Sequence, residues 1–357
     1  MAYDVEAISK EFQVDVVAQP YGNGHINDTY VVDGSPRYIL QSINTTIFKD
    51  PDGLMENICG ITEHLKDKLI KIGGDPNRET LTVIKTKSGK AYYKADETTC
   101  FRMYKFIDGT VSYDTITDPI QLYHVAKAFG KFQKMLADYP AETLHETIVN
   151  FHNTVDRFRQ LHEAIDENKA GRLDEVKSEI EFALQREKEA AKVIDGIADG
   201  TIPIRVTHND TKLNNVMMDE VTGEGVCVID LDTVMPGSLL YDFGDALRFA
   251  GSSGAEDETD LDKIWFDLAA YEQFTKGFLE ELRDTLTKRE AELLSFSVKL
   301  MTLECGIRFL ADYLNGDTYF KIHREKHNLD RCRTQFKLVA DIESKLAQMD
   351  KINAKYL

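Results

Sequence analysis

The pattern of apolar and polar positions changes once along the chain, near residue 110. Before that point, short runs of β-branched and aromatic residues are separated by turn sequences such as Asp33-Gly34-Ser35-Pro36, which is typical of an antiparallel sheet. A short helix is expected at the start and a longer one before the fourth strand. The pattern predicts helices over 5–12 and 54–69, and five strands over 14–21, 26–32, 37–43, 81–85 and 101–107.

From about residue 119 the apolar positions recur at helical spacing. One stripe with steps of three and four lies between 122 and 136, and a second lies between 329 and 346. The segment 166–190 is crowded with Glu, Lys and Arg, and it is interpreted as a solvent-exposed helical face.

The strand-like pattern of the first part and the helical pattern of the second predict a fold class and a division into domains. We expect an α+β fold of two lobes, in which a small antiparallel β lobe precedes a larger and mainly helical lobe. The last predicted strand ends near Asp108-Gly109. The predicted lobes therefore comprise residues 1–108 and 109–357.

One hairpin interrupts the helical part. The apolar runs 216–218 and 226–229 flank a turn-rich stretch, and pairing that is symmetric about Thr222-Gly223 would place Asn215 opposite Asp230. Directly opposite residues on antiparallel strands have Cβ atoms about 4.5 to 5.5 Å apart. An amide oxygen and a carboxylate would then converge on one point. Mg²⁺ prefers hard oxygen ligands of this kind, so the hairpin predicts a magnesium site.

A polar string precedes the hairpin and contains His208, Asp210 and Lys212, followed by Asn215. Asp210 is predicted to accept the proton of a hydroxyl group that attacks phosphorus. Lys212 would offset charge on the transferring phosphoryl group, and His208 is interpreted as a structural residue of the loop. A catalytic Asp followed by a metal-binding Asn and a further Asp is the arrangement of phosphotransferases.

Further polar residues near these segments have more open roles. Asp232 is a candidate for a second metal contact or for a contact to a substrate hydroxyl, and Asp242 is expected to brace the loop. In the N-terminal part, the glycine-bearing turn Tyr21-Gly22-Asn23-Gly24-His25 would let backbone amides approach phosphates closely, because glycine has no Cβ.

Composition and charge narrow the classes of partner. The 357 residues contain 43 Lys and Arg against 61 Asp and Glu, a net charge of −18, which disfavours nucleic acid and anionic membranes as partners. The start of the chain has no basic segment followed by an apolar one, so a cytoplasmic protein is expected. The five cysteines are widely spaced and are interpreted as reduced thiols. No zipper-like seam is visible, which favours a monomer.

Several blocks of the sequence resemble a known family. The order of a β-rich lobe with a glycine turn, a hinge, HNDTKLNN and VIDLD is similar to the aminoglycoside phosphotransferase and choline kinase group of the protein-kinase-like fold. Within that group, the chain resembles the N-acetylhexosamine 1-kinases, which phosphorylate the anomeric hydroxyl of GlcNAc and GalNAc. The blocks that carry the likeness are PYGNGHINDTY, RYILQSIN, RMYKFIDGTVSY, RVTHNDTKLNN, IDLDTVMPGSLLYDFGDALRF and ECGIRFLADYL.

The resemblance implies a role for individual residues. It implies ATP as co-substrate with Mg²⁺, a free sugar as acceptor and a place in carbohydrate metabolism. Asp210 would be the general base, and Asn215 and Asp230 would be the magnesium ligands. The nucleotide would meet Gly22, Gly24, His25, Asn27 and the hinge at Lys105 and Ile107. The sugar would meet Asp232, Phe249, Arg308 and Tyr319.

One departure from the family pattern keeps alternatives open. Protein kinases carry a Lys on the third strand, whereas the matching strand here ends in Gln41, which is uncharged. A nucleotide-binding regulator without transfer activity is therefore one alternative. Another is a kinase with a different acceptor, such as another sugar, choline or homoserine. A third is a metal hydrolase built from His208, Asp210, Asp230 and Asp232.

Overall fold

The computed structural model describes residues 3–14, 18–21, 27–115 and 118–357, which form two compact units. We call them the sheet unit and the helical unit. The sheet unit comprises Met1–Ser112, Met135–Val149 and Asn215–Pro236, and the helical unit comprises Tyr113–Lys134, Asn150–Asn214 and Gly237–Leu357. Two later segments thus pack with the N-terminal part, and the predicted division into lobes at 108/109 stays a prediction.

The sheet unit is built on the antiparallel sheet that the alternation predicts. Its strand order is β1-β2-β3-β6-β4, and the two-residue strand β5, which the pattern did not predict, pairs with β6. The five predicted strands are present with shorter or shifted bounds. The bounds in the sheet are β1 (Ala18–Pro20), β2 (Thr29–Val32), β3 (Tyr38–Asn44), β4 (Val83–Ile84), β5 (Tyr93–Lys94) and β6 (Thr99–Lys105).

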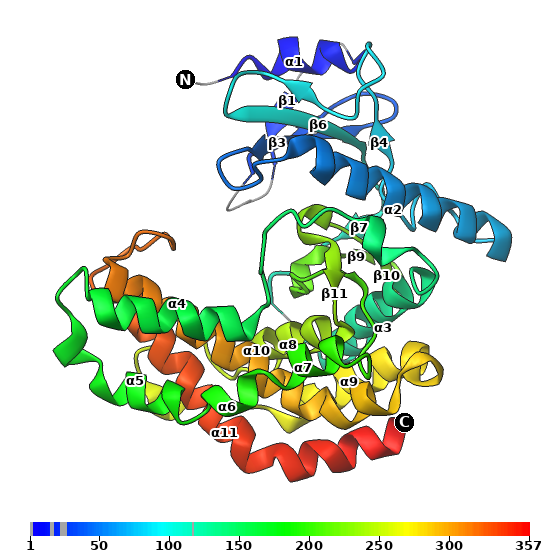
Figure 1. Ribbon diagram of the computed structural model, residues 1–357. Helices are drawn as coiled ribbons and strands as arrows, with labels where there is room; N and C mark the ends of the chain where they lie inside the picture. Colours follow the sequence, from blue (N-terminus) through cyan, green and yellow to red (C-terminus); the bar gives the residue numbers. More distant parts are fainter. Residues whose placement is uncertain (1–2, 15–17, 22–26, 116–117) are drawn as a thin grey trace. The chain divides into compact units, whose positions relative to one another are not determined.

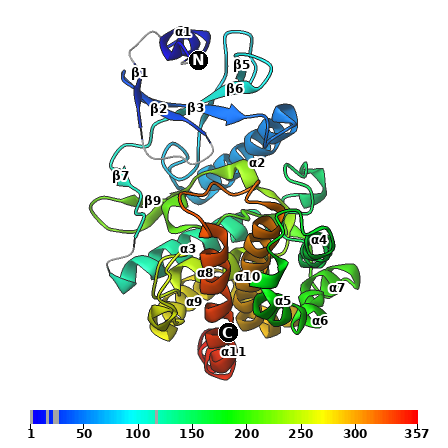
Figure 2. The ribbon, with the colours of Figure 1, turned by 90° about the vertical axis from the view of Figure 1, so that its left-hand side faces the viewer.

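Two helices flank this sheet. Helix α1 (Val5–Glu11) covers one face, where Ile8 and Phe12 pack against the buried Val32, Leu40 and Met103. Helix α2 (Pro51–Ile72) lies on the side away from α1 (Figures 1 and 2). It begins earlier than the apolar stripe indicates, because the side chain of Asp50 accepts a hydrogen bond from the N–H of Gly53 at 3.0 Å and caps the helix.

The predicted hairpin is present, but its predicted register is wrong by one residue. Strands β9 (Val216–Asp219) and β10 (Gly225–Val228) pair so that Val216 lies opposite Val228, and the N–H of Ile229 donates to the C=O of Asn215 at 2.9 Å. Asn215 therefore faces Ile229, and Asp230 follows with a left-handed backbone, φ 58°. Strand β7 (Thr110–Val111) pairs with the other edge of β9.

Two local features cause the offset. The side chain of Asp219 accepts the N–H groups of Val221 and Thr222 at 2.9 and 2.8 Å, which centres the turn one residue earlier than expected. An irregularity between Gly225 and Cys227 then inserts one extra residue into β10, which recovers part of the offset.

The helical unit is organised around one long buried helix. Helix α10 packs against α11, α8 and α4 (Figure 1), and it is buried on most sides, so it lacks a distinct polar face. The predicted helices are confirmed as α3 and α11. The bounds are α3 (Pro119–Met135), α4 (Thr154–Glu167), α5 (Lys177–Leu184), α6 (Glu187–Ala190), α7 (Lys192–Ala198), α8 (Leu239–Ala250), α9 (Leu268–Leu282), α10 (Lys288–Asn315) and α11 (His327–Tyr356).

The contact between α8 and α10 depends on a glycine, and replacing it should destabilise the protein. A Cβ built at Gly244 would lie 2.5 Å from the backbone oxygen of Ser297, which cannot move without displacing α10. We expect Gly244→Ala to lower the free energy of unfolding by about 1–3 kcal/mol, measured by urea unfolding. Gly254→Ala is the control, because its Cβ would lie close only to the side-chain tip of Ile264, at 2.6 Å, and would make ordinary contacts of 3.8 Å with Glu258 and Lys263. Equal stability of the two variants would contradict this account.

No helix in the described part of the chain is both long and apolar enough to cross a bilayer. The observed architecture, an antiparallel sheet with a larger helical part, confirms the predicted α+β fold class.

Candidate active site

The loop that carries Asp210 follows strand β8 (Arg205–Thr207) in the helical unit. The buried carboxylate of Asp242 on α8 accepts the N–H of His208 at 2.9 Å and the N–H of Asn209 at 2.7 Å. The hydroxyl of Thr211 donates to the C=O of Asp242 at 2.7 Å. Asp242 therefore braces the loop, as the sequence analysis expected.

Asp210 is ionised and lies beside a cation. Burial alone would raise its pKa, but the charge and hydrogen bonds of Lys212, together with the charges of His208 and Arg248, hold the pKa below its ordinary value. The Lys212 Nζ lies 2.8 Å from one carboxylate oxygen and 3.0 Å from the other. The N–H of Asp210 donates to Nδ1 of His208 at 3.3 Å, and the buried His208 ring packs edge-on to Phe129. His208 thus has the structural surroundings expected of it.

Phe249, a predicted sugar contact, lies near the same loop. The guanidinium of Arg248 stacks 3.8 Å from the centre of its ring, and the Nζ of Lys212 lies 6.0 Å from that centre. Arg248 is buried and forms ion pairs with Asp245 and Glu256 at 3.0 and 2.9 Å. Its charge is therefore balanced locally, and it contributes to the low pKa of Asp210.

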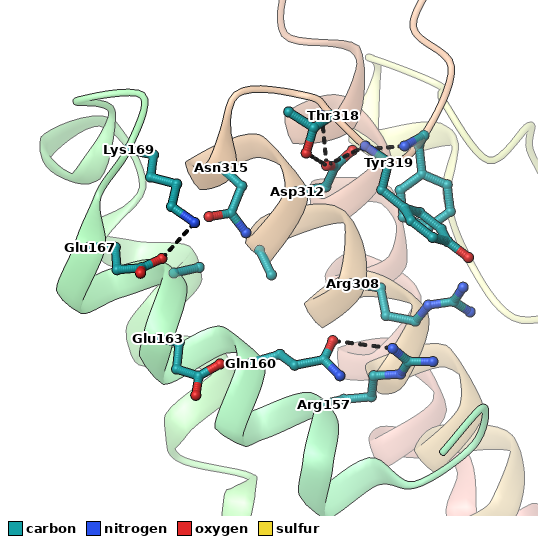
Figure 3. A pocket seen from close by; sticks show the side chains of 13 residues that line it. Arg157, Gln160, Glu163, Glu167, Lys169, Arg308, Asp312, Asn315, Thr318 and Tyr319 are labelled. Atoms are coloured by element: carbon teal, nitrogen blue, oxygen red, sulfur yellow. Dashed lines mark hydrogen bonds and ion pairs between the residues drawn. The ribbon is translucent and has the colours of Figure 1, made fainter. Parts of the chain in front are cut away.

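A pocket of about 290 Å³ lies within the helical unit and contains two further predicted sugar contacts, Arg308 and Tyr319. Figure 3 shows side chains of α4 on one side and those of α10 and the following loop on the other. The guanidinium groups of Arg157 and Arg308 lie at one end of the pocket, near Tyr319 (Figure 3). The lining residues are Arg157, Gln160, Glu163, Ala164, Glu167, Lys169, Arg308, Ala311, Asp312, Asn315, Thr318, Tyr319 and Phe320.

The acids of this pocket are already engaged. Asp312 accepts the N–H groups of Thr318, Tyr319 and Phe320 at 2.9, 2.8 and 2.9 Å, which shapes the loop. Glu167 forms an ion pair with Lys169 at 2.8 Å. Glu163 forms an ion pair with Arg159 at 2.5 Å. These contacts occupy the carboxylates of the pocket, and Asp312, which is held by neutral N–H groups, keeps its negative charge.

The two arginines have different surroundings. The Nη1 of Arg157 donates to the Oε1 of Gln160 at 3.2 Å, and its Nη2 donates to the C=O of Phe151 at 2.7 Å. The Nε–H of Arg157 is buried and has no hydrogen-bond partner among the described residues. The guanidinium of Arg308 lies 5.4 Å from the ring centres of Phe151 and Phe320 and 5.9 Å from that of Tyr319. Burial and the like charge of Arg308 lower the pKa of Arg157. This end of the pocket therefore offers the positive charge of two guanidinium groups and aromatic faces to an uncharged or anionic group.

In the sheet unit, Asp232 is held by two side chains. One carboxylate oxygen pairs with Arg102, and the other accepts from the Nδ2 of Asn27 at 2.8 Å. The Nε of Arg102 also donates to the Oε1 of Gln41 at 3.0 Å. Arg102 and Asp232 are only 1% and 3% exposed. Burial would lower the pKa of Arg102, but the charges of Asp232 and Asp230 raise it.

Asn215 and Asp230, the predicted metal ligands, belong to the same unit. Asn215 ends the 3-10 turn η3 (Leu213–Asn215) and is buried, and Asp230 directly precedes η4 (Leu231–Thr233). The backbone bond between Asn215 and Ile229 brings the two segments together just before Asp230. An amide and a carboxylate on adjoining strand ends are a donor set that fits Mg²⁺.

The predicted nucleotide contacts are only partly described. Gly22, Gly24 and His25 lie outside the described residues. Asn27 is buried, and its Oδ1 accepts the N–H of Asn44 at 3.1 Å.

At the predicted hinge, the N–H of Lys105 donates to the C=O of Thr82 at 3.0 Å, and the C=O of Ile107 accepts the hydroxyl of Thr110 at 2.8 Å. The nucleotide-binding roles of these positions stay predictions.

Sequence reasoning missed several polar residues that the fold buries near these positions. Arg102 lies inside a strand of otherwise apolar residues, and Glu304 lies inside the apolar stretch of α10. Each is a charged residue at a position where the apolar pattern predicts a buried side chain. This mismatch could have indicated that each residue has a buried partner. Arg157 and His152 gave no such signal, because their segment is polar.

Comparison with known proteins places the chain in a family. The model of the phosphotransferase enzyme family matches residues 17–278. A solved microcompartment-associated aminopropanol kinase is 17% identical, with a TM-score of 0.54 and coverage of 97% of this chain and 98% of that one.

Two other solved structures have the same fold at low identity. An aminoglycoside phosphotransferase from Alicyclobacillus acidocaldarius is 11% identical, with a TM-score of 0.64 and coverage of 99% and 98% of this chain and of that one. A spectinomycin phosphotransferase in complex with ADP and spectinomycin is 15% identical, with a TM-score of 0.60 and coverage of 96% and 97%.

These matches confirm the broader resemblance that the sequence blocks indicated, while the narrower likeness to the N-acetylhexosamine 1-kinases stays a prediction. Because the family match covers most of the sequence, this chain belongs to the phosphotransferase enzyme family.

Proposed function

We propose that this protein transfers the γ-phosphoryl group of ATP to the anomeric hydroxyl of an N-acetylhexosamine. The observation that carries the choice of acceptor is the pocket lined by Arg157, Arg308 and Tyr319. Its donors suit the carbonyl oxygen of an acetamido group and sugar hydroxyls, and its aromatic side chains suit the apolar face of a sugar ring.

The charge of the pocket argues against cationic acceptors. Choline and other amino alcohols carry a positive charge, which acidic groups and aromatic faces stabilise. Here the guanidinium groups of Arg157 and Arg308 line the pocket, and their positive charge would repel a cation. An uncharged N-acyl sugar avoids this repulsion and gains hydrogen bonds.

Asp210 is proposed as the group that accepts the proton of the attacking hydroxyl. Its low pKa keeps it ionised at neutral pH, so it can orient the hydroxyl by a charge-assisted hydrogen bond before transfer. Lys212 lies 2.8 Å away and is proposed to offset negative charge on the transferring group. The loose transition state of phosphoryl transfer leaves positioning and charge neutralisation as the main contributions of the protein.

Asn215 and Asp230 are proposed to hold Mg²⁺, since they offer hard oxygen donors at adjoining strand ends. When bound, the ion neutralises phosphate charge. Asp232 is proposed as a substrate contact. Each of its carboxylate oxygens has a second lone pair besides the one that Arg102 or Asn27 uses, so the side chain can still accept from a hydroxyl.

An ADP-release assay tests the proposed acceptor. We expect MgATP-dependent ADP release with GlcNAc or GalNAc and none with their 1-O-methyl glycosides, because the methyl group blocks the attacking oxygen. Phosphorus NMR of the product should show a phosphate coupled to the anomeric proton. Equal activity with the blocked glycosides would refute transfer to the anomeric oxygen.

The same assay separates the alternatives. Activity with choline, ethanolamine or homoserine in place of the sugars would overturn the acceptor assignment but keep the kinase. Tight ATP binding without release of ADP for any acceptor would favour a nucleotide-binding regulator. Product formation without ATP would favour a metal hydrolase.

A further inference from the structure

A buried ion pair lies behind the loop that carries Asp210, within the helical unit. The Nδ1 of His152 lies 2.8 Å from the Oε1 of Glu304, and its Nε2 lies 3.1 Å from the C=O of Asn209, the residue before Asp210. The side chains of His152 and Glu304 are 6% and 1% exposed. Asn209 has a left-handed backbone, φ 64°, so this peptide is held in an unusual conformation.

The two hydrogen bonds fix the protonation state of the imidazole ring. A backbone carbonyl and an ionised carboxylate can only accept hydrogen bonds. Both ring nitrogens of His152 must therefore donate, and only the imidazolium ion carries a proton on each nitrogen. Glu304 is ionised in this pair: burial would raise its pKa, but the positive charges of His152, Arg157 and Arg308 lower it.

We propose that His152 is a cationic positioning residue, which holds the carbonyl of Asn209 and thereby fixes the peptide that carries Asp210. The carboxylate of Asp242 accepts hydrogen bonds from two backbone N–H groups of this loop, whereas His152 donates to a backbone C=O group of the loop. This inference rests on the proposed role of Asp210 in phosphoryl transfer. It assigns a function to a buried histidine that does not touch either substrate.

Loss of the proton on Nε2 of His152 would turn the hydrogen bond to the carbonyl of Asn209 into a repulsive contact. The carboxylate of Glu304 would retain the remaining proton on Nδ1, so the lone pair of Nε2 would face the lone pairs of the carbonyl oxygen. An attractive bond would become a repulsive contact. The left-handed Asn209 peptide would then be released, and Asp210 would lose its orientation.

The charged groups around His152 determine the pH at which it loses its proton. Burial lowers the pKa of His152, but Glu304 on α10, Asp245 on α8 and the carbonyl of Asn209 together raise it above its ordinary value. Tyr241 on α8 packs tilted against the ring at 5.3 Å. The hydrogen bond from His152 to the carbonyl of Asn209 is thus fully formed below the ordinary histidine pKa. It is lost as the pH rises through the raised pKa of His152.

The pH dependence of turnover tests the proposal. We expect an alkaline decrease of kcat in the wild type, and Glu304→Gln should move it by about one to three pH units toward lower pH by removing the nearby negative charge. His152→Asn should lower kcat at neutral pH by up to about 10²-fold. Both amides are permanent donors, but only the longer side chain of His152→Gln has about the reach of Nε2, so this variant should restore part of kcat without the alkaline decrease.

A matched control exists on α4, which begins two residues after His152. His162 forms an exposed pair with Glu187 at 2.9 Å, and His162→Asn should leave kcat and its pH profile unchanged. If folded Glu304→Gln and the wild type give the same pH profile, the proposal is overturned.

Amide hydrogen exchange separates this proposal from the proposed function. At one pH, exchange in a peptide that covers residues 207–212 should be faster in His152→Asn than in the wild type or in His162→Asn. Equal exchange would overturn the positioning role, whatever the activity. If no acceptor yields ADP while exchange does increase, the proposed function fails and the hold of His152 on Asn209 is supported.

Discussion

Replacing Asp210 by Asn should lower kcat by about 10² to 10⁴, the range expected for loss of a general base. The amide keeps the size of the side chain but cannot accept the proton of the attacking hydroxyl. KM for ATP and for the sugar should change little, because the substitution removes an interaction that matters most in the transition state. Steady-state ADP release at saturating substrate measures the change. Near-normal turnover would remove Asp210 from this role.

The pH profile adds a second measure of the same site. Lys212 holds the pKa of Asp210 below its ordinary value, so the reactive carboxylate is present at neutral pH and is lost only as the pH falls through that lowered pKa. Lys212→Met removes the charge and should move the acid decrease of kcat toward higher pH. Circular dichroism at each pH identifies any loss of activity that comes from unfolding.

Local patterns predicted the elements of the fold well. The stripe from Leu122 to Leu136 became α3, and most of the alternating apolar runs before residue 110 became strands of the sheet. Helix and strand formation depend on spacing over a few residues, which the sequence contains directly. The strand β5 was missed because its two residues, unlike those of β4, do not belong to a longer run of β-branched and aromatic residues.

The register of the hairpin depended on contacts that the apolar pattern does not contain. Symmetric pairing placed Asn215 opposite Asp230, whereas the Asp219 side chain and an extra residue in β10 place it opposite Ile229. The first feature is a side chain that caps the turn, and the second is a bulge in a strand. The alternation of apolar positions contains no information about either. The candidate magnesium ligands remain on adjoining strand ends, but they are not direct partners.

Buried polar pairs were the least predictable part of the site. Arg102 meets Asp232 across 130 positions of the sequence, and His152 meets Glu304 across 152. No local rule joins residues at such separations. The motif around Asp210 could be found because its members lie within a few residues of one another, while the groups that hold the motif come from distant elements.

Replacing Arg102 by Met should be among the most destabilising substitutions in the sheet unit. It leaves the carboxylate of Asp232 buried without its cation, and breaking a buried pair in this way costs about 3–5 kcal/mol. The free energy of unfolding from urea titration measures the loss. The double variant Arg102→Met with Asp232→Leu removes both charges and should recover much of that loss.

The same pair explains how the sheet unit accommodates Gln41. In the pairing of β3 with β6, Gln41 lies directly opposite Arg102, and its Oε1 accepts from the Arg102 Nε at 3.0 Å. A positive charge therefore lies on the strand next to Gln41, where it is bound to Asp232.

Arg102→Lys keeps that charge but cannot reproduce the planar fork that reaches Gln41 and Asp232 together. The free energy of unfolding of Arg102→Lys should lie between that of Arg102→Met and that of the wild type. A lysine variant as stable as the wild type would show that charge alone, and not the guanidinium fork, holds Asp232 in the sheet unit.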